Sequence, residues 1–169
     1  MGLIRLQSSS LPSGSVLQVK SIDSDLHLTH TAEVQTPTDT GIGAISMTRT
    51  QNSSKFLISL TGGRMRTRAA AGYNVYFYAK EGTGSYASVV TTGTTDEENS
   101  LGFFYTNMTD TMQSPTAIQY LYTPTSSTAD CDFKVYFTRF GTASNSTAFN
   151  LFDTNAGARM HFTVMEIAG

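Results

Sequence analysis

Apolar and polar residues alternate one by one over long parts of this sequence, and this pattern constrains the fold more than any other feature. Successive side chains of an extended strand point to opposite faces, so a period of two is typical of a strand with one buried face. The pattern is clearest over Tyr73–Lys80, where one face would carry Tyr73, Val75, Phe77 and Ala79. The same alternation recurs in three further segments, at Lys55–Thr61, Asp132–Phe140 and Met160–Ile167.

Less regular alternation predicts further strands, at Val16–Lys20, His27–Val34, Ala44–Thr50, Tyr86–Thr91, Leu101–Thr106, Ile118–Tyr122 and Ala148–Phe152. Turn-forming residues separate the predicted strands, at positions 12–14, 37–41, 62–63, 82–84, 93, 124 and 155–157. No window of about 12 residues has the apolar spacing of an amphipathic helix. The sequence therefore predicts an all-β fold, an antiparallel β-sandwich of about ten strands that resembles a jelly roll.

A length of 169 residues suits one domain, but the first residues differ from the rest. Their apolar side chains are interrupted by serines at 8–10 and by the turn residues at 12–14: Leu3, Ile4, Leu6 and Leu11. We predict that residues 1–15 form an extended arm that docks on another molecule, and that residues 16–169 form a single β-sandwich domain. The alternative for the arm is a frayed terminus or an edge strand of the same sheet.

The surface predicted from the composition is polar but poor in charge. Charged residues make up 14% of the chain, against about 25% in a typical soluble protein. A net charge of −2 argues against binding to nucleic acid or to an anionic membrane. The chain has neither a secretory signal nor the roughly 20 consecutive apolar residues of a membrane span. We expect a protein that is made in a cytoplasm and either stays there or leaves it within an assembly.

No residue pattern indicates catalysis. The single cysteine, Cys131, lies between Asp130 and Asp132, and their charges would raise the pKa of its thiol, which disfavours a nucleophile. The three acidic residues at 96–98 are adjacent on a polar loop, whereas a glycosidase needs two carboxylates that face each other across a sugar. The histidines lack the spacing of a metal site: His27, His30 and His161. We expect no enzymatic activity, no cofactor and no metal ion.

Three arginines alternate with other residues after the Gly62-Gly63 pair: Arg64, Arg66 and Arg68. In an extended segment they would project from one face about 7 Å apart, since each residue adds about 3.3 Å. A row of like charges is unfavourable unless something anionic lies opposite. We predict a subunit or partner contact, for example with the acidic loop 96–98 of a neighbouring copy. The alternative is a solvated loop.

Five tyrosines fall on the polar faces of their predicted strands: Tyr76, Tyr78, Tyr120, Tyr122 and Tyr136. Tyrosine is common at interfaces and on sugar-binding faces because it gives a large contact area at a low cost in entropy. The alternative is that these rings cover the second face of the sheet while their hydroxyls reach water.

The last predicted strand, Met160–Ile167, is apolar on both faces. Met160, Phe162 and Val164 share one face, and the opposite face carries Met165 and Ile167. A strand with two apolar faces is typical of the centre of a sheet or of a surface that faces another subunit. Met165 and Ile167 are therefore predicted interface residues.

Four stretches carry a resemblance to a known group of proteins: Gly-Ser-Val-Leu-Gln-Val at 14–19, Gln-Asn-Ser-Ser-Lys-Phe-Leu-Ile at 51–58, Ser-Pro-Thr-Ala-Ile-Gln-Tyr at 114–120 and Phe-Thr-Val-Met-Glu-Ile-Ala-Gly at 162–169. Their order and spacing resemble small virion-associated proteins of the fibre or decoration type from tailed bacteriophages of marine bacteria. Segments 64–68 and 101–112 depart from that group. The resemblance implies a β-sandwich component of tail fibres, fibre tips or capsid surfaces, often trimeric and without catalytic residues.

The sequence thus predicts a non-enzymatic virion structural protein, a capsid decoration or tail-fibre component that forms a homo-oligomer, a trimer, on the particle surface. The expected location is the virion, assembled in the cytoplasm of the host bacterium. Expected partners are other copies of the chain and capsid or tail proteins, and neither nucleic acid nor a membrane. The alternative is a receptor-binding or glycan-binding tip module of a phage tail, with a host surface glycan as its ligand. The predicted contact residues are Leu3, Ile4, Leu6, Leu11, Arg64, Arg66, Arg68, Met165 and Ile167.

Overall fold

The computed structural model describes residues 11–30, 33–68, 71–91, 93, 98–106, 111–141, 147–149 and 159–169. The predicted arm residues Leu3, Ile4 and Leu6 and the predicted turn at 155–157 lie outside these ranges. Among the described residues, no helix has the length and apolar character needed to cross a membrane.

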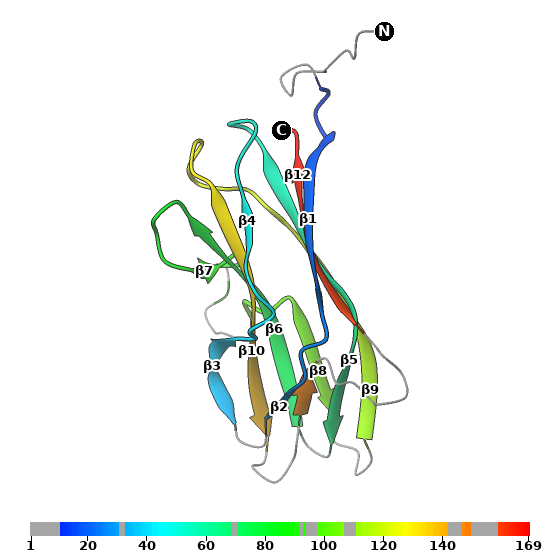
Figure 1. The fold of residues 1–169 in the computed structure, drawn as a ribbon. Coiled ribbons are helices and arrows are strands. Elements are labelled where there is room, and N and C mark those ends of the chain that lie inside the picture. The colour runs from blue at the N-terminus through cyan, green and yellow to red at the C-terminus, as the bar shows by residue number, and fades with distance from the viewer. Residues whose placement is uncertain are drawn as a thin grey trace, which may run out of the picture.

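The described residues form twelve strands in two antiparallel sheets that pack face to face (Figure 1). Their bounds are β1 Val16–Ser24, β2 Leu28–His30, β3 Val34–Asp39, β4 Ile45–Met47, β5 Lys55–Arg68, β6 Ala71–Glu81, β7 Ala87–Ser88, β8 Gly102–Thr106, β9 Thr111–Tyr122, β10 Cys131–Gly141, β11 Thr147–Phe149 and β12 Met160–Ile167. Sheet A has the order β1-β12-β5-β11-β2, with β9 also paired to β5. Sheet B has the order β3-β10-β6-β7, with β4 paired to β10 and β8 paired to β6. The predicted all-β antiparallel sandwich is confirmed.

The core lies between the two sheets and is built from alternate residues of the long strands. Rings from the two sheets meet there, with centroids 5.2 Å apart for Phe56 and Phe133 and 6.2 Å apart for Phe77 and Phe162. Further buried residues of the core follow the predicted period of two, among them Ile58, Leu60, Val75, Val135 and Val164. Burial of these large side chains is the main driving force for the fold.

The pair Gly62-Gly63 is a bulge inside β5, not the predicted turn. Both glycines have positive φ angles, 76° and 63°, and the register with β9 shifts between Gly62 and Met65. Gly63 donates its backbone N–H to the carbonyl of Arg159 at 2.6 Å. The bulge inverts the alternation, since even-numbered residues such as Leu60 are buried before it and odd-numbered Met65 is buried after it.

A second predicted turn, at 37–41, begins later than expected. Strand β3 continues through Pro37 to Asp39, which is tolerated because β3 is an edge strand of sheet B. Three predicted strands are also shorter or divided: 27–34 is split between β2 and β3, 44–50 is reduced to β4, and 86–91 is reduced to β7. Local alternation does not reveal where a strand loses its hydrogen-bonding neighbour.

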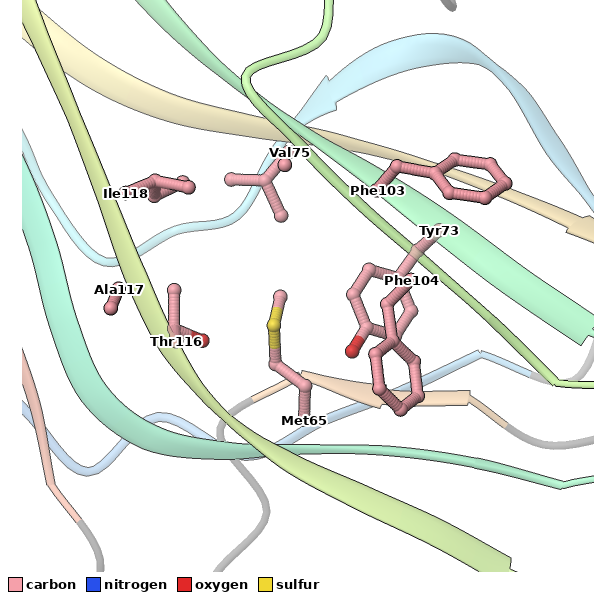
Figure 2. Close-up of a pocket in the computed structure, with 9 residues that line it drawn as sticks. Met65, Tyr73, Val75, Phe103, Phe104, Thr116, Ala117 and Ile118 are labelled. Atoms are coloured by element: carbon pink, nitrogen blue, oxygen red, sulfur yellow. The ribbon is translucent and has the colours of Figure 1, made fainter.

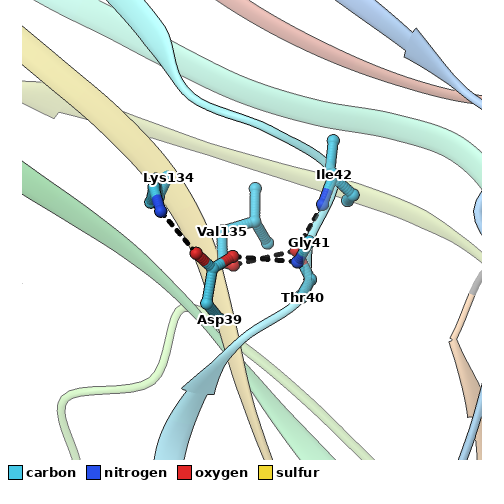
Figure 3. A network of polar contacts seen from close by, with 6 residues as sticks. All are labelled: Asp39, Thr40, Gly41, Ile42, Lys134 and Val135. Carbon is cyan, nitrogen blue, oxygen red and sulfur yellow. Dashed lines mark hydrogen bonds and ion pairs between the residues drawn. The ribbon is translucent and has the colours of Figure 1, made fainter.

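A polar network fixes the turn that follows β3 (Figure 3). The carboxylate of Asp39 accepts hydrogen bonds from the backbone N–H of Gly41 at 2.9 Å and from the ammonium of Lys134 at 2.6 Å. The buried hydroxyl of Thr40 donates to the carbonyl of Val135 at 2.9 Å. The Asp39 hydrogen bond raises the pKa of Lys134. These contacts hold the edge of sheet B against β10.

The backbone at residues 14–15 continues the pairing of sheet A beyond β1. Gly14 donates its N–H to the carbonyl of Ala168 at 2.8 Å, and Ala168 donates to the carbonyl of Ser15 at 2.8 Å. The start of β1 therefore lies beside the C-terminal residues (Figure 1). The last two residues of the predicted arm are thus hydrogen-bonded to Ala168 just before β1 begins, and the docking of the arm, residues 1–15, on another molecule stays a prediction.

Candidate interaction surfaces

Four aliphatic side chains form a continuous row across the outer face of sheet A, which we call the apolar row. Val19 of β1 pairs with Met165 of β12, Met165 pairs with Leu57 of β5, and Leu57 pairs with Leu121 of β9. Directly opposed residues in antiparallel strands share a face, and the neighbours of Leu57 and Met165 along their strands are buried in the core. Val19 and Leu121 are 53% and 50% exposed.

The apolar row continues toward one end of the sheet and is bordered by polar groups elsewhere. Val16, which is 51% exposed, pairs with Ile167, and Ile167 pairs with Lys55 on its other side. The next row of the sheet is polar and contains Ser21, Thr163, Ser59 and Gln119. Met165 and Ile167, the interface residues predicted from the last strand, therefore both belong to an apolar area with a polar border. Their contact with a partner stays a prediction.

A buried carboxylate supports this end of sheet A. Glu166 of β12 is fully buried and accepts hydrogen bonds from the side-chain amide of Gln18 at 2.6 Å and from the backbone N–H of Thr50 at 2.8 Å. Burial would raise the pKa of Glu166, but the hydrogen bonds that it accepts lower the pKa on balance. The ionised carboxylate thus fixes β1 and the loop before β5 to β12.

The predicted row of arginines lies on β5, after the bulge, so the alternative of a solvated loop is wrong. Met65, between Arg64 and Arg66, is 5% exposed and belongs to the core, which places the two half-buried arginines on the opposite, outer side of the strand. Arg68 pairs with Thr111 of β9 at the end of the strand. Of the predicted acidic partner loop at 96–98, residues 96 and 97 lie outside the described residues. The row of arginines as a partner contact therefore stays a prediction.

The predicted exposure of Tyr76 is wrong. This side chain is 1% exposed, and its hydroxyl lies 3.0 Å from Thr138 Oγ1, which also accepts a hydrogen bond from the amide of Asn74 at 3.1 Å. The phase predicted for the strand is correct, but β6 is a central strand of sheet B, and from Ala71 to Phe77 the residues on both of its faces are buried. Tyr78 and Tyr136 stack on each other on the same outer face, with ring centroids 4.0 Å apart.

Three other rings form a second exposed row, on the outer face of sheet B, which we call the aromatic row. Phe103 and Tyr105 of β8 are 63% and 46% exposed, and both stack on Phe140 of β10 with centroids 5.5 Å and 5.7 Å apart. The rings are nearly parallel, at 10° and 15°. The sequence alone does not predict that Phe103 and Phe140 share a surface, because the aromatic row forms only when β8 pairs with β6.

A large hollow opens between the hairpin after β6 and the end of β9. It has a volume of about 500 Å³ and is lined by Tyr120 and Tyr122, which also pack against the core, and by residues with hydroxyl groups such as Ser85 and Ser88. This hollow brings two of the predicted tyrosines beside the predicted hairpin tip at 82–84. Its size is within the range of ligand sites, which is about 300–1,000 Å³.

Glu81, in the wall of the large hollow, is occupied by structural hydrogen bonds. Its carboxylate accepts bonds from the hydroxyl of Tyr122 at 2.5 Å, the backbone N–H and hydroxyl of Thr125 at 2.8 Å and 3.0 Å, and the N–H of Ser126 at 2.7 Å. Burial would raise the pKa of Glu81, but these bonds lower it on balance. The four bonds hold the loop after β9 in place.

The remaining reactive side chains are also held in structural contacts. Cys131 is buried, and burial, followed by the charge of Glu81, raises the pKa of its thiol to about 12. The charges of Asp130 and Asp132 also raise this pKa, as predicted, but they contribute less than burial and Glu81 do. His161 pairs with Asp23 across β12 and β1 at 2.6 Å, and the ring of His30 packs on Phe137. Within the described ranges, no three His, Cys, Asp or Glu side chains are grouped so that they could hold a metal ion.

Comparisons with known proteins add little to these observations. A scan against models of protein families finds no match, and a search of curated proteins finds none either. Among solved structures, the chain is similar to a chain in the structure of infectious bursal disease virus Gx strain, with a TM-score of 0.40 and 12% sequence identity. The match covers 99% of the present chain and 41% of the other, so the present chain spans about two fifths of that chain's length. At this identity and TM-score, the match assigns neither a family nor a function.

Proposed function

We propose that this protein is a non-enzymatic structural subunit of a bacteriophage particle and that it assembles with copies of itself through the outer face of sheet A. The observation that carries the proposal is the apolar row of Val19, Met165, Leu57 and Leu121, which crosses four neighbouring strands. Single exposed apolar residues are ordinary on protein surfaces, whereas a contiguous apolar area with a polar border is typical of an interaction site.

The occupant that we propose for the apolar row is a second copy of the chain. The row and its hydroxyl-rich border carry little charge, and the whole chain has only 14% charged residues, so identical copies meet without strong repulsion. Burial of apolar area contributes about 25 cal/mol per Å², which favours association of two such faces. A closed ring of copies would bury the face of each. The resemblance to phage virion proteins favours a ring of three.

The finer parts of the proposal rest on the sequence. The resemblance favours a tail-fibre or capsid decoration component in a virion assembled in the cytoplasm of the host bacterium. We propose that the arm residues Leu3, Ile4, Leu6 and Leu11 attach the subunit to a capsid or tail protein. We propose that Arg64, Arg66 and Arg68 contact an acidic partner surface.

Light scattering on a sizing column tests self-assembly. We expect the protein to elute as an oligomer, about three times the chain mass of 18.3 kDa, over a wide range of concentrations. The double substitution Leu121→Gln and Met165→Gln should give a folded monomer, because it places polar groups in the contact. The matched control, Phe103→Gln, changes an exposed side chain on the other sheet and should leave the oligomer intact. A monomeric parent protein, or an oligomer that survives the double substitution, would contradict the proposal.

A second candidate function is supported by the large hollow. Its two tyrosine rings and several hydroxyls are the groups that stack on a sugar and hydrogen-bond to it. We propose, as the alternative, that the protein is a receptor-binding tip whose ligand is a host surface glycan. A glycan array tests it: Tyr120→Ala should abolish the signal, and Tyr105→Ala, outside the hollow, should preserve it. An array without any signal from the parent protein would count against this function.

A further inference from the structure

A small cavity lies between the two sheets, in a place that neither proposed function uses. It has a volume of about 150 Å³ and is partly open to solvent. Its walls come from β5 and β9 of sheet A and from β6 and β8 of sheet B (Figure 2). The outer-face apolar row lies on the other side of sheet A, so occupation of this cavity and self-assembly are independent.

Most of the cavity wall is apolar. Met65, Val75, Phe104 and Ile118 line it, and none of the described residues in its wall has a charged side chain. The ring of Phe104 stacks on the ring of Tyr73, with centroids 5.4 Å apart and 16° between the planes. A charged ligand would lose its hydration here without gaining a counter-charge, which favours a neutral one.

Two buried hydroxyl groups in the wall lack hydrogen bonds. Tyr73 is 2% exposed and Thr116 is 5% exposed, and neither Tyr73 Oη nor Thr116 Oγ1 has a partner within the described part of the chain. Figure 2 shows both oxygens directed toward the space around the side chain of Met65. Buried hydroxyls almost always have a partner, so these two indicate a polar atom that the described residues do not supply.

Tyr73 acts as a hydrogen-bond donor in this setting. Burial raises the pKa of its phenol well above the ordinary value, so the hydroxyl keeps its proton at all physiological pH values. The complementary group on a ligand is an oxygen that accepts a hydrogen bond, as a hydroxyl or carbonyl oxygen does.

We propose that the small cavity binds a neutral molecule with an apolar body about the size of a benzene ring and one oxygen that accepts a hydrogen bond from Tyr73. An apolar cavity of about 150 Å³ is large enough for a benzene ring. The ring or short aliphatic body packs against Met65, Val75 and Ile118, and Thr116 also lines the cavity, on the other side of Met65 from the Tyr73 hydroxyl (Figure 2).

Binding of p-cresol and of toluene to the full chain, measured by titration calorimetry, tests this site. The two probes have similar size and shape, and only p-cresol carries a hydroxyl. We expect p-cresol to bind at one site per chain, and toluene to bind about three- to tenfold more weakly, as the loss of one hydrogen bond predicts. Tyr73→Phe should reduce the affinity for p-cresol to that of toluene and leave the toluene affinity unchanged.

The matched control is Tyr105→Phe, which removes the hydroxyl of a half-exposed tyrosine on the outer face of sheet B. This variant should bind p-cresol as the parent does. The proposal is overturned if p-cresol does not bind, if both probes bind the parent equally, or if a crystal structure grown with p-cresol shows only ordered water at Tyr73 Oη. None of these outcomes depends on whether the protein forms an oligomer.

Discussion

The ring of Phe140 lies directly over Gly72 of the neighbouring strand. The two residues are paired in the register of β10 and β6, and a Cβ atom at position 72 would lie 2.3 Å from Phe140 Cζ. The same atom would lie 2.5 Å from the backbone carbonyl oxygen of Phe104, which cannot rotate away. Gly72 is therefore required by the close packing of the aromatic row.

Gly72→Ala should destabilise the protein by about 1–3 kcal/mol, the usual cost of overpacking. The free energy of unfolding in urea measures this effect. Near-UV circular dichroism should change at the same time, because Phe140 and its stacked neighbours must move. Unchanged stability and an unchanged aromatic signal would contradict the packing described here.

Tyr73→Phe should stabilise the protein in the absence of any ligand, by about 1 kcal/mol, because it removes a buried hydroxyl that has no partner among the described residues. Tyr76→Phe is the matched comparison, since its hydroxyl lies 3.0 Å from Thr138 Oγ1. That variant should lose about 1 kcal/mol. Thermal or urea unfolding should show a gain in the free energy of unfolding for Tyr73→Phe and a loss for Tyr76→Phe. Equal losses in the two variants would show that the Tyr73 hydroxyl is hydrogen-bonded.

Stability should fall in acid because of two glutamates whose carboxylates accept several hydrogen bonds, Glu81 and Glu166. The pKa of Glu81 and that of Glu166 are lowered from the ordinary value of 4.5, so the folded state binds these protons less tightly than the unfolded chain does. Their stabilisation is complete above pH 4.5 and is lost as the pH falls through the lower folded-state pKa. The urea midpoint between pH 7 and pH 3 measures this loss.

Glu166→Gln should lower stability at pH 7 and reduce the further loss in acid, since the variant no longer titrates at this site. Asp25→Asn, a change at an exposed carboxyl, serves as the control and should follow the parent curve. A parent protein whose urea midpoint stays constant down to pH 3 would be inconsistent with this role.

Deletion of Gly63 should abolish folding. Without the bulge, the phase of the strand beyond it shifts by one residue, so Met65 would point to solvent and the two neighbouring arginines would point into the core. Burial of unpaired charges costs more than about 3 kcal/mol, which is a large part of the stability of a small domain. Circular dichroism and amide NMR dispersion measure the result, and a native-like spectrum would show that the bulge is dispensable.

The long strands could be predicted from the sequence because their inner positions carry large apolar residues in an unbroken period of two. Phe56 and Ile58, or Phe133 and Val135, define their inner face without knowledge of any neighbour. The Gly62-Gly63 pair could not be assigned in the same way, since glycines with positive φ occur both in turns and in bulges. Only the pairing with β9 distinguishes the two.

The interaction surfaces were harder to predict because they depend on register. Met165 was identified from its own strand, but Val19, Leu57 and Leu121 become its neighbours only through three strand pairings. The unpartnered hydroxyl of Tyr73 has no local signal either, since tyrosine at an inner position is ordinary. Sequence patterns show which face of a strand is buried, whereas cross-strand neighbours follow from the topology.

The position of β12 in the sequence determines when the apolar row of sheet A can form during synthesis. In sheet A, β1 has β12 as its strand neighbour, although about the whole length of the chain separates the two segments. Contacts of such large sequence separation slow folding, because a long loop must close before they form. The nascent chain therefore carries β1 unpaired until residues 160–167 have left the ribosome. A copy interrupted before that point lacks Met165 and cannot complete the apolar row, so only copies synthesised beyond β12 have the surface through which we propose that subunits join.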